Sequence, residues 1–265
     1  MCFYVILTAV RRLAIRPGAI GDFVVSLPAL ESLRAETTHF ELWTAGPNVP
    51  LARFPDCTRS ILSTGLDLLE LGQAGPDLIE TLGGFDSIVS WYGANRPDFR
   101  DLVRSLGLPF TFFPALPPAD WDAPAAEFYL EQARTICDVP SDGIPRIACQ
   151  TTRENFAVIH PFSGSAKKNW PLAKFRSLAR QLERTMPIRW CAGPDDPPLE
   201  NAVRMQDLYD LACWLSTARL YVGNDSGITH LAAAVGTPVL AIFGPSRSEV
   251  WAPWGPNVRV ARFIP

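Results

Sequence analysis

Short apolar runs alternate with amphipathic segments along most of this 265-residue chain. The runs at residues 220–222 and 239–243 have the length of buried strands, and glycine-rich turns and segments of helical periodicity separate them. Over residues 172–183, apolar side chains recur at helical spacing while basic side chains occupy the other face. Strands that alternate with helices are typical of a parallel sheet covered by helices. The pattern therefore predicts an α/β protein.

A first glycine-containing turn follows a predicted strand near the start of the chain. Residues 13–15 form the strand and run into Arg-Pro-Gly-Ala-Ile-Gly-Asp, which ends at Asp22. An apolar helical segment follows, and Asp22 lies at its mouth. Because Pro28 lies well inside that segment, we expect the helix to begin near Ser26 or to kink at Pro28. By itself, Asp22 also fits a simple N-cap.

A second turn, Gly-Asn-Asp-Ser-Gly at residues 223–227, connects the strand at 220–222 to a helix expected over 228–235. The first N–H groups of such a helix and its dipole favour an anion, so a phosphate would fit there. An ordinary βαβ unit explains the pattern equally well. In that case Asp225 or Ser226 is only the N-cap, and His230 is a satisfied core residue.

A third loop, residues 160–171, brings hydroxyl groups, backbone amides and two lysines together between a strand and a helix. This combination suits a diphosphate, because amides and hydroxyls cradle its oxygens while an ammonium group neutralises its charge. The Walker A pattern is absent, and a solvated loop with surface lysines is the alternative. After the next strand, Asp195 and Asp196 lie where a carboxylate can accept hydrogen bonds from ribose, although turn formation explains both almost as well.

Composition excludes several classes of protein. The net charge is −3 and no long basic block occurs, which argues against nucleic-acid binding. Six cysteines are scattered without a C-x-x-C pair and only three histidines occur, so neither a zinc site nor a disulfide framework is indicated. We expect buried thiols in a reducing cytoplasm.

The length of the chain predicts two domains, which we place at residues 1–152 and 153–265. The first ten residues are apolar but lack a basic region, a cleavage site and the length to span a bilayer. They are interpreted as an extra strand or a misassigned start. A soluble, cytoplasmic protein is expected.

Three stretches, in this order, carry a family resemblance: RPGAIGDFVVSLPALESLR, IHPFSGSAKKNWPLAKF, and VGNDSGITHLAAAVGTPVLAIFGPS followed by WAPWGP. Together they resemble glycosyltransferase family 9, the ADP-heptose:lipopolysaccharide heptosyltransferases and their relatives. The resemblance implies a GT-B fold, with two Rossmann-like domains whose parallel sheets face each other across a cleft. It places the acceptor on the N-terminal domain and the nucleotide-sugar donor on the C-terminal domain.

The resemblance also implies an activity: inverting, metal-independent transfer of a sugar, expected to be heptose from ADP-heptose, to a hydroxyl group of a bacterial surface glycan or lipid-linked saccharide. The reaction would occur at the cytoplasmic face of the inner membrane, with peripheral membrane contact for a lipid-linked acceptor. No cofactor beyond the nucleotide-sugar co-substrate is implied. Asp22 matches the general base of the family. The residues that the resemblance assigns to the donor phosphates and sugar are Ser163, Gly164, Ser165, Lys168, Asp225, Ser226, Gly227 and His230, and approximate alignment adds Asp196 for the ribose and Gln206 for the base.

One departure from the family keeps alternatives open. Family members commonly continue past the W-G-P segment with a helix that crosses back and braces the two domains, whereas this sequence ends at Pro265. A nucleotide-binding module without transfer activity, or an inactive or partner-dependent homologue, is therefore the alternative to an active transferase. A NAD-dependent oxidoreductase is disfavoured because no G-x-G-x-x-G follows any strand.

Overall fold

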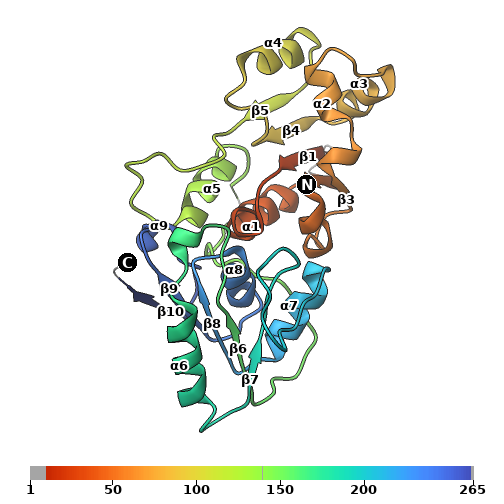
Figure 1. Ribbon diagram of the computed structural model, residues 1–265. Helices are drawn as coiled ribbons and strands as arrows, with labels where there is room; N and C mark the ends of the chain where they lie inside the picture. The colour runs from red at the N-terminus through yellow and green to blue at the C-terminus, as the bar shows by residue number, and fades with distance from the viewer. Residues whose placement is uncertain (1–9, 139, 264–265) are drawn as a thin grey trace, which may run out of the picture. The chain divides into compact units, whose positions relative to one another are not determined.

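The computed structural model describes residues 10–138 and 140–263 and contains two parallel five-stranded sheets (Figure 1). Contacts between Cα atoms divide the chain into two compact units. Unit 1 holds the described residues up to Gly18 together with the described parts of Leu30–Pro117 and Gln132–Pro140. Unit 2 holds Ala19–Ala29, Pro118–Glu131 and the described residues from Ser141 onward.

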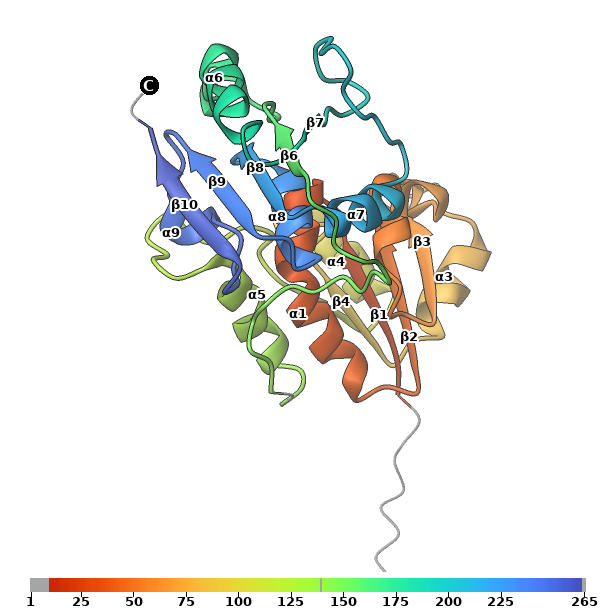
Figure 2. The same ribbon diagram turned by 90° about the horizontal axis from the view of Figure 1, so that it is seen from below.

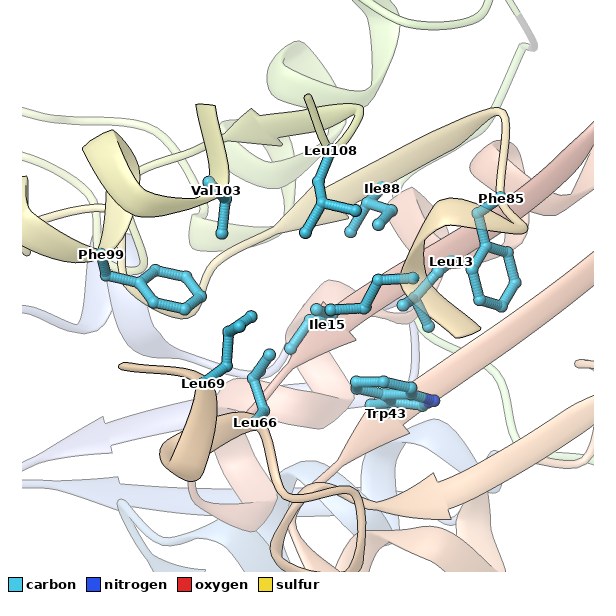
Figure 3. Packing of buried hydrophobic residues seen from close by; sticks show 11 residues of the cluster. Leu13, Ile15, Trp43, Leu66, Leu69, Phe85, Ile88, Phe99, Val103 and Leu108 are labelled. Atoms are coloured by element: carbon cyan, nitrogen blue, oxygen red, sulfur yellow. The ribbon is translucent and has the colours of Figure 1, made fainter. Parts of the chain in front are cut away.

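Unit 1 contains a sheet of strand order β3-β2-β1-β4-β5, in which all neighbours are parallel. Its strands are β1 (Arg11–Arg16), β2 (His39–Thr44), β3 (Cys57–Ser60), β4 (Ser87–Ser90) and β5 (Phe110–Phe112). Its helical segments are η1 (Gly46–Leu51), η2 (Ile61–Ser63), α2 (Leu66–Glu70), α3 (Pro76–Gly83) and α4 (Pro97–Ser105). Ile15, Trp43 and Ile88 from the central strands form a core with residues of α2 and α4 (Figure 3).

Unit 2 contains a sheet of strand order β10-β9-β8-β6-β7, with β10 at one edge (Figure 2). Its strands are β6 (Ala157–His160), β7 (Ile188–Trp190), β8 (Leu220–Asn224), β9 (Val239–Phe243) and β10 (Val258–Arg262). Its helical segments are η3 (Ala166–Lys168), α6 (Leu172–Leu182), α7 (Leu208–Thr217), α8 (Gly227–Ala234) and α9 (Ser248–Trp251). Helix α8 is buried along its length, which explains its small apolar residues.

Two further helices, α1 (Ile20–Ala35) and α5 (Ala125–Arg134), contribute residues to both units. Of the two alternatives for α1, a start near Ser26 is wrong, because the helix begins at Ile20 and Pro28 lies inside it; a kink at Pro28 stays a prediction. Proline disfavours a helix interior, but Phe23, Val24 and Leu27 are fully or almost fully buried. Tertiary packing of this face therefore outweighs the local preference.

The structure confirms the predicted α/β class with two parallel sheets, and it corrects some local details. Strand β3 ends at Ser60, and the 3-10 helix η2 follows it directly. Cys137 and Cys191 are buried as expected, but Cys57, Cys149 and Cys213 are partly exposed. The prediction for the first ten residues falls almost entirely outside the described part, and the domain boundary near Thr152 stays a prediction. No helix within the described ranges is long and apolar enough to cross a bilayer.

Candidate functional site

Asp22, Lys168, Asp225 and His230 come from three distant stretches of sequence and all belong to unit 2. Asp22 lies in the first turn of α1, Lys168 ends η3 in the loop after β6, and Asp225 follows β8 directly. His230 lies one turn inside α8. In a parallel sheet, residues after the strands gather at the carboxyl edge, which is where such sheets bind ligands. This group of four residues is called the charged cluster below.

The first turns of α1 and α8 contact each other through glycines. A Cβ atom on Gly227 would lie 2.8 Å from Ile20 Cβ and 2.9 Å from the backbone nitrogen of Gly21. A Cβ atom on Gly21 would lie 3.3 Å from Cδ2 of His230 and 3.4 Å from Gly227 Cα. Only residues without a side chain permit this approach. Two helix N-termini, each with the positive end of its dipole, therefore meet beside the charged cluster.

Lys168 and Asp225 form an ion pair at the start of α8. The Nζ–Oδ2 distance is 2.8 Å, and the Asp225 side chain is 6% exposed whereas that of Lys168 is 38% exposed. The two groups are close but are not aligned as a hydrogen bond, since Oδ2 of Asp225 has no hydrogen-bond partner among the described residues. The buried carboxylate is thus neutralised by a half-exposed ammonium group that remains accessible to an anion.

The simple capping interpretations are not realised in the structure. Ser226 occupies the N-cap position of α8, yet its side chain makes no capping hydrogen bond and instead lies 3.1 Å from Oγ1 of Thr229. Asp22 lies inside the first turn of α1 rather than before it. An acidic residue there still interacts favourably with the helix dipole, so its place has a structural benefit as well.

His230 reports on the electrostatics of the charged cluster. Burial lowers the pKa of its imidazole to about 4, while the carboxylates of Asp225 and Asp22 act in the opposite direction and Lys168 adds to the lowering. A hydrogen bond with the backbone of Trp251 also opposes the lowering of this pKa. His230 is therefore neutral near pH 7, and it experiences the charges of the other three members.

The loop after β6 is held by its own polar groups. The Ser163 hydroxyl lies 2.8 Å from the carbonyl oxygen of Ser165 and 2.9 Å from Oδ1 of Asn169, so it fastens the loop rather than projecting from it. Gly164 is exposed, and a Cβ atom there would meet nothing within 4 Å. The backbone amide of Gly164 is the group in this part of the loop that suits an anion, because the amide of Ser165 donates a long hydrogen bond of 3.4 Å to the Ser163 hydroxyl.

Asn224 is a structural residue of the site that the sequence analysis missed. It is fully buried at the end of β8, and its side chain donates to the carbonyl of Pro161 at 2.7 Å and accepts from the backbone N–H of Trp170 at 2.9 Å. It thereby ties the Lys168 loop to the strand that carries Asp225. Its position directly before Asp225 was the available signal, but an Asn in a glycine-rich turn is ordinarily explained by turn formation.

Asp196 and Gln206 lie in the long connection between β7 and α7, apart from the charged cluster in sequence. Asp196 Oδ2 accepts hydrogen bonds from the backbone N–H of Gly193 at 2.6 Å and from Nε2 of His160 at 3.2 Å. Gln206 is exposed and directly precedes Asp207, which caps α7 through Tyr209 N and Asp210 N. His160 is the second residue that the sequence analysis did not single out.

No group of three or more His, Cys, Asp or Glu side chains in the described ranges is arranged to hold a metal ion. The site offers the chemistry of an anion-binding cradle: an ammonium group, two helix N-termini and a loop amide, with the carboxylate of Asp22 beside them. Such a site suits a phosphate ester next to a group that accepts a proton.

Comparisons with known proteins show the family and the fold that this chain resembles. Residues 122–264 match the model of a family described as glycosyltransferase family 9 (heptosyltransferase). Lipopolysaccharide heptosyltransferase 3 of Escherichia coli is 29% identical over an alignment 121 residues long, which covers 40% of this chain and 36% of that protein. The chain thus spans little more than a third of that relative. Lipooligosaccharide heptosyltransferase 2 of Haemophilus influenzae is 24% identical over an alignment of 95% of this chain and 88% of the relative.

Among solved structures, E. coli ADP-heptose lps heptosyltransferase II superimposes with a TM-score of 0.73 at 18% identity, covering 96% of this chain and 91% of that one. The glycosyltransferase family 9 structure from Veillonella parvula gives a TM-score of 0.74 at 17% identity, with coverage of 97% and 87%. At these identities the similarity establishes the fold. It confirms the predicted GT-B fold class.

Proposed function

The chain belongs to glycosyltransferase family 9, and we propose that it transfers a heptose from ADP-heptose to a hydroxyl group of an acceptor of the lipopolysaccharide-core type. The observation that carries the proposal is the charged cluster, in which Asp22, Lys168, Asp225 and His230 lie together where two helix N-termini meet. The E. coli and H. influenzae relatives, by their names, act on lipopolysaccharide or lipooligosaccharide. That substrate class is extended here to this chain.

In the proposed reaction, Asp22 is the general base. Its carboxylate takes the proton of the acceptor hydroxyl as the acceptor oxygen forms a bond to the anomeric carbon of the heptose. The bond from that carbon to the diphosphate breaks, and ADP leaves with the electron pair. Attack opposite the leaving group inverts the anomeric configuration.

The departing diphosphate gains negative charge, which the protein must stabilise. Lys168 supplies a positive charge that Asp225 offsets in part, and the backbone amides of Gly164 and Gly227 and the hydroxyl of Ser165 would supply donors, with the dipole of α8 behind them. Because Lys168 is already held 2.8 Å from Asp225, it is positioned before the donor binds. Asp225 and the neutral His230 then face the sugar side of the diphosphate. With this charge supplied by the protein, we propose transfer without a metal ion.

The remaining assignments are proposals of the same kind. Asp196 would contact the donor ribose and Gln206 the base, and Ser163 and Ser226 would shape the phosphate loops. The N-terminal domain would bind the acceptor at the cytoplasmic face of the inner membrane. A nucleotide-binding module, or a homologue that needs a partner for turnover, shares the donor site and differs in catalysis alone.

Parallel isothermal titrations with ADP, UDP and GDP test the donor site. We expect ADP to bind most tightly, and Lys168→Ala to weaken ADP binding by about tenfold to a hundredfold, the usual loss for a hydrogen bond to a charged group. Lys167→Ala is the matched control, because Lys167 is an exposed neighbour in the same loop and should leave binding unchanged. Equal losses in both variants would contradict the assignment. Turnover of ADP-heptose with acceptor separates the transferase from the binding module.

A further inference from the structure

His160, at the end of β6, is buried and forms a hydrogen bond with Asp196 in the loop after β7. The proposed reaction gives His160 no role. The residue is 3% exposed, and its Nε2 lies 3.2 Å from Oδ2 of Asp196. Within the described ranges its Nδ1 has no hydrogen-bond partner. Asp196 is therefore the group that selects the tautomer, and the ring presents an Nε2–H donor to the carboxylate.

The two oxygens of Asp196 have different environments. Oδ2 accepts both from His160 Nε2 and from the backbone N–H of Gly193 at 2.6 Å. Oδ1 accepts no hydrogen bond from the described residues, and it is not among the fully buried polar atoms that lack a partner. With 22% of the side chain exposed, Oδ1 is the oxygen open to a ligand. These hydrogen bonds, the one from His160 foremost, lower the pKa of Asp196, so the carboxylate is ionised near pH 7.

Arg204 holds the backbone of the same loop but does not contact the carboxylate group. Its guanidinium donates to the carbonyl oxygens of Gly193 and Asp196 and, at 2.8 Å, of Pro197. The loop backbone is thus fixed by Arg204, and the carboxylate is held by His160 together with the backbone N–H of Gly193. Separate hydrogen bonds therefore hold the backbone of the loop and the carboxylate of Asp196.

We propose that His160 is a positioning residue that orients Asp196, so that Oδ1 accepts a hydrogen bond from a ribose hydroxyl and the site prefers a ribonucleotide to its deoxy analogue. The inference rests on the proposed function, because it assumes a nucleoside diphosphate donor. A carboxylate after a strand of a parallel sheet is well placed for ribose. The new element is His160, which orients the carboxylate of Asp196, and the selectivity for ribose over deoxyribose that follows from this orientation.

The test compares ADP, 2′-deoxy-ADP and 3′-deoxy-ADP by isothermal titration. The wild-type protein should bind ADP about tenfold to a hundredfold more tightly than the analogue that lacks the contacted hydroxyl. In His160→Leu this ratio should fall close to one. In His160→Gln, whose amide N–H reaches about as far as Nε2–H, most of the ratio should return. Asp196→Asn removes the charge and should reduce the ratio as well.

Controls separate positioning from a merely structural role. Inorganic pyrophosphate should bind wild type and His160→Leu equally, because the charged cluster is intact, and His39→Leu should keep the ADP to deoxy-ADP ratio. If His160→Leu does not fold, His160→Asn, whose amide is too short to reach Asp196, takes its place and should also lose the ratio. A ratio that is unchanged in the folded His160 variants overturns the inference. A wild-type protein that binds ADP without ribose selectivity overturns this inference alone, whereas absence of ADP binding overturns the proposed function.

Discussion

Replacing Gly227 by alanine should separate the starts of α1 and α8. The new Cβ atom would lie 2.8 Å from Ile20 Cβ and 2.9 Å from the nitrogen of Gly21, and neither of these atoms is at the end of a flexible side chain. Ordinary contact for such atoms is about 3.5–4.0 Å, so the two helix starts must move apart by roughly 0.5–1 Å. Overpacking of this kind costs about 1–3 kcal/mol of unfolding free energy.

Catalysis should suffer as well as stability, because Asp22 follows Gly21 and moves with α1. Misplacement of a reacting group by about 1 Å costs on the order of a hundredfold in rate. We therefore expect the kcat of Gly227→Ala, measured by ADP release from ADP-heptose and acceptor, to fall about tenfold to a hundredfold. Measurements are made well below the thermal midpoint, so that unfolding does not contribute.

Two other glycines calibrate this series. Gly21→Ala meets atoms at 3.3 and 3.4 Å and should have a smaller effect, and Gly164→Ala meets nothing within 4 Å and should retain stability. The expected order of disturbance is Gly164, then Gly21, then Gly227. If Gly227→Ala folds and turns over donor at the wild-type rate, then the close approach of α1 and α8 is not needed to place Asp22, and the reasoning is wrong.

Three further predictions concern charge, metal and thiols. As pH falls from the ordinary His pKa of 6.5 to about 4, the unfolded chain takes up a proton that buried His230 does not. The unfolding free energy should therefore decrease by about 3 kcal/mol over this range, a dependence that denaturant titration should find lost in His230→Gln and kept in His39→Gln. Dialysis against EDTA should leave the transfer rate unchanged, and a loss restored by added divalent ions would refute metal-independent transfer. The Sγ atoms of Cys149 and Cys213 lie 3.1 Å apart, so a shift of about 1 Å would bring them to the S–S bond length of about 2.05 Å. A diamide-type oxidant should therefore take two electrons from this thiol pair and join it, as mass spectrometry of the peptides would show, and Cys213→Ser should prevent the linkage.

Local signals predicted the β8–α8–β9 unit within a residue or two. The glycine turn, the run of small apolar residues and the Gly-Thr-Pro turn all favour the same structure, and tertiary contacts reinforce it. A start of α1 near Ser26 was one of the two alternatives and was wrong, because Pro28 is a local signal against a helix. Burial of Phe23, Val24 and Leu27 is a tertiary fact that the local pattern does not contain.

The sequence allowed the residues of the charged cluster to be named, but not the residues that hold their loops in place. Asp22, Lys168, Asp225 and His230 were named from the family's motifs, and the structure brings them together, while their roles stay predictions. His160 and Asn224 could not, because a polar residue that ends an apolar strand has the same sequence pattern whether it faces solvent or holds a loop. Which loop each residue holds depends on the order of the strands in the sheet. That β6 lies between β7 and β8 cannot be read from the local sequence pattern.

The most direct test of the central claim is the transfer rate of Asp22→Asn, with ADP affinity measured on the same preparation. The asparagine keeps the shape of the side chain in the first turn of α1 but cannot accept the proton of the acceptor hydroxyl. Loss of general-base catalysis predicts a decrease in kcat of about a hundredfold to ten-thousandfold with ADP binding nearly unchanged. An Asp22→Asn enzyme that retains the wild-type kcat would contradict the account, because another group would then have to accept the proton.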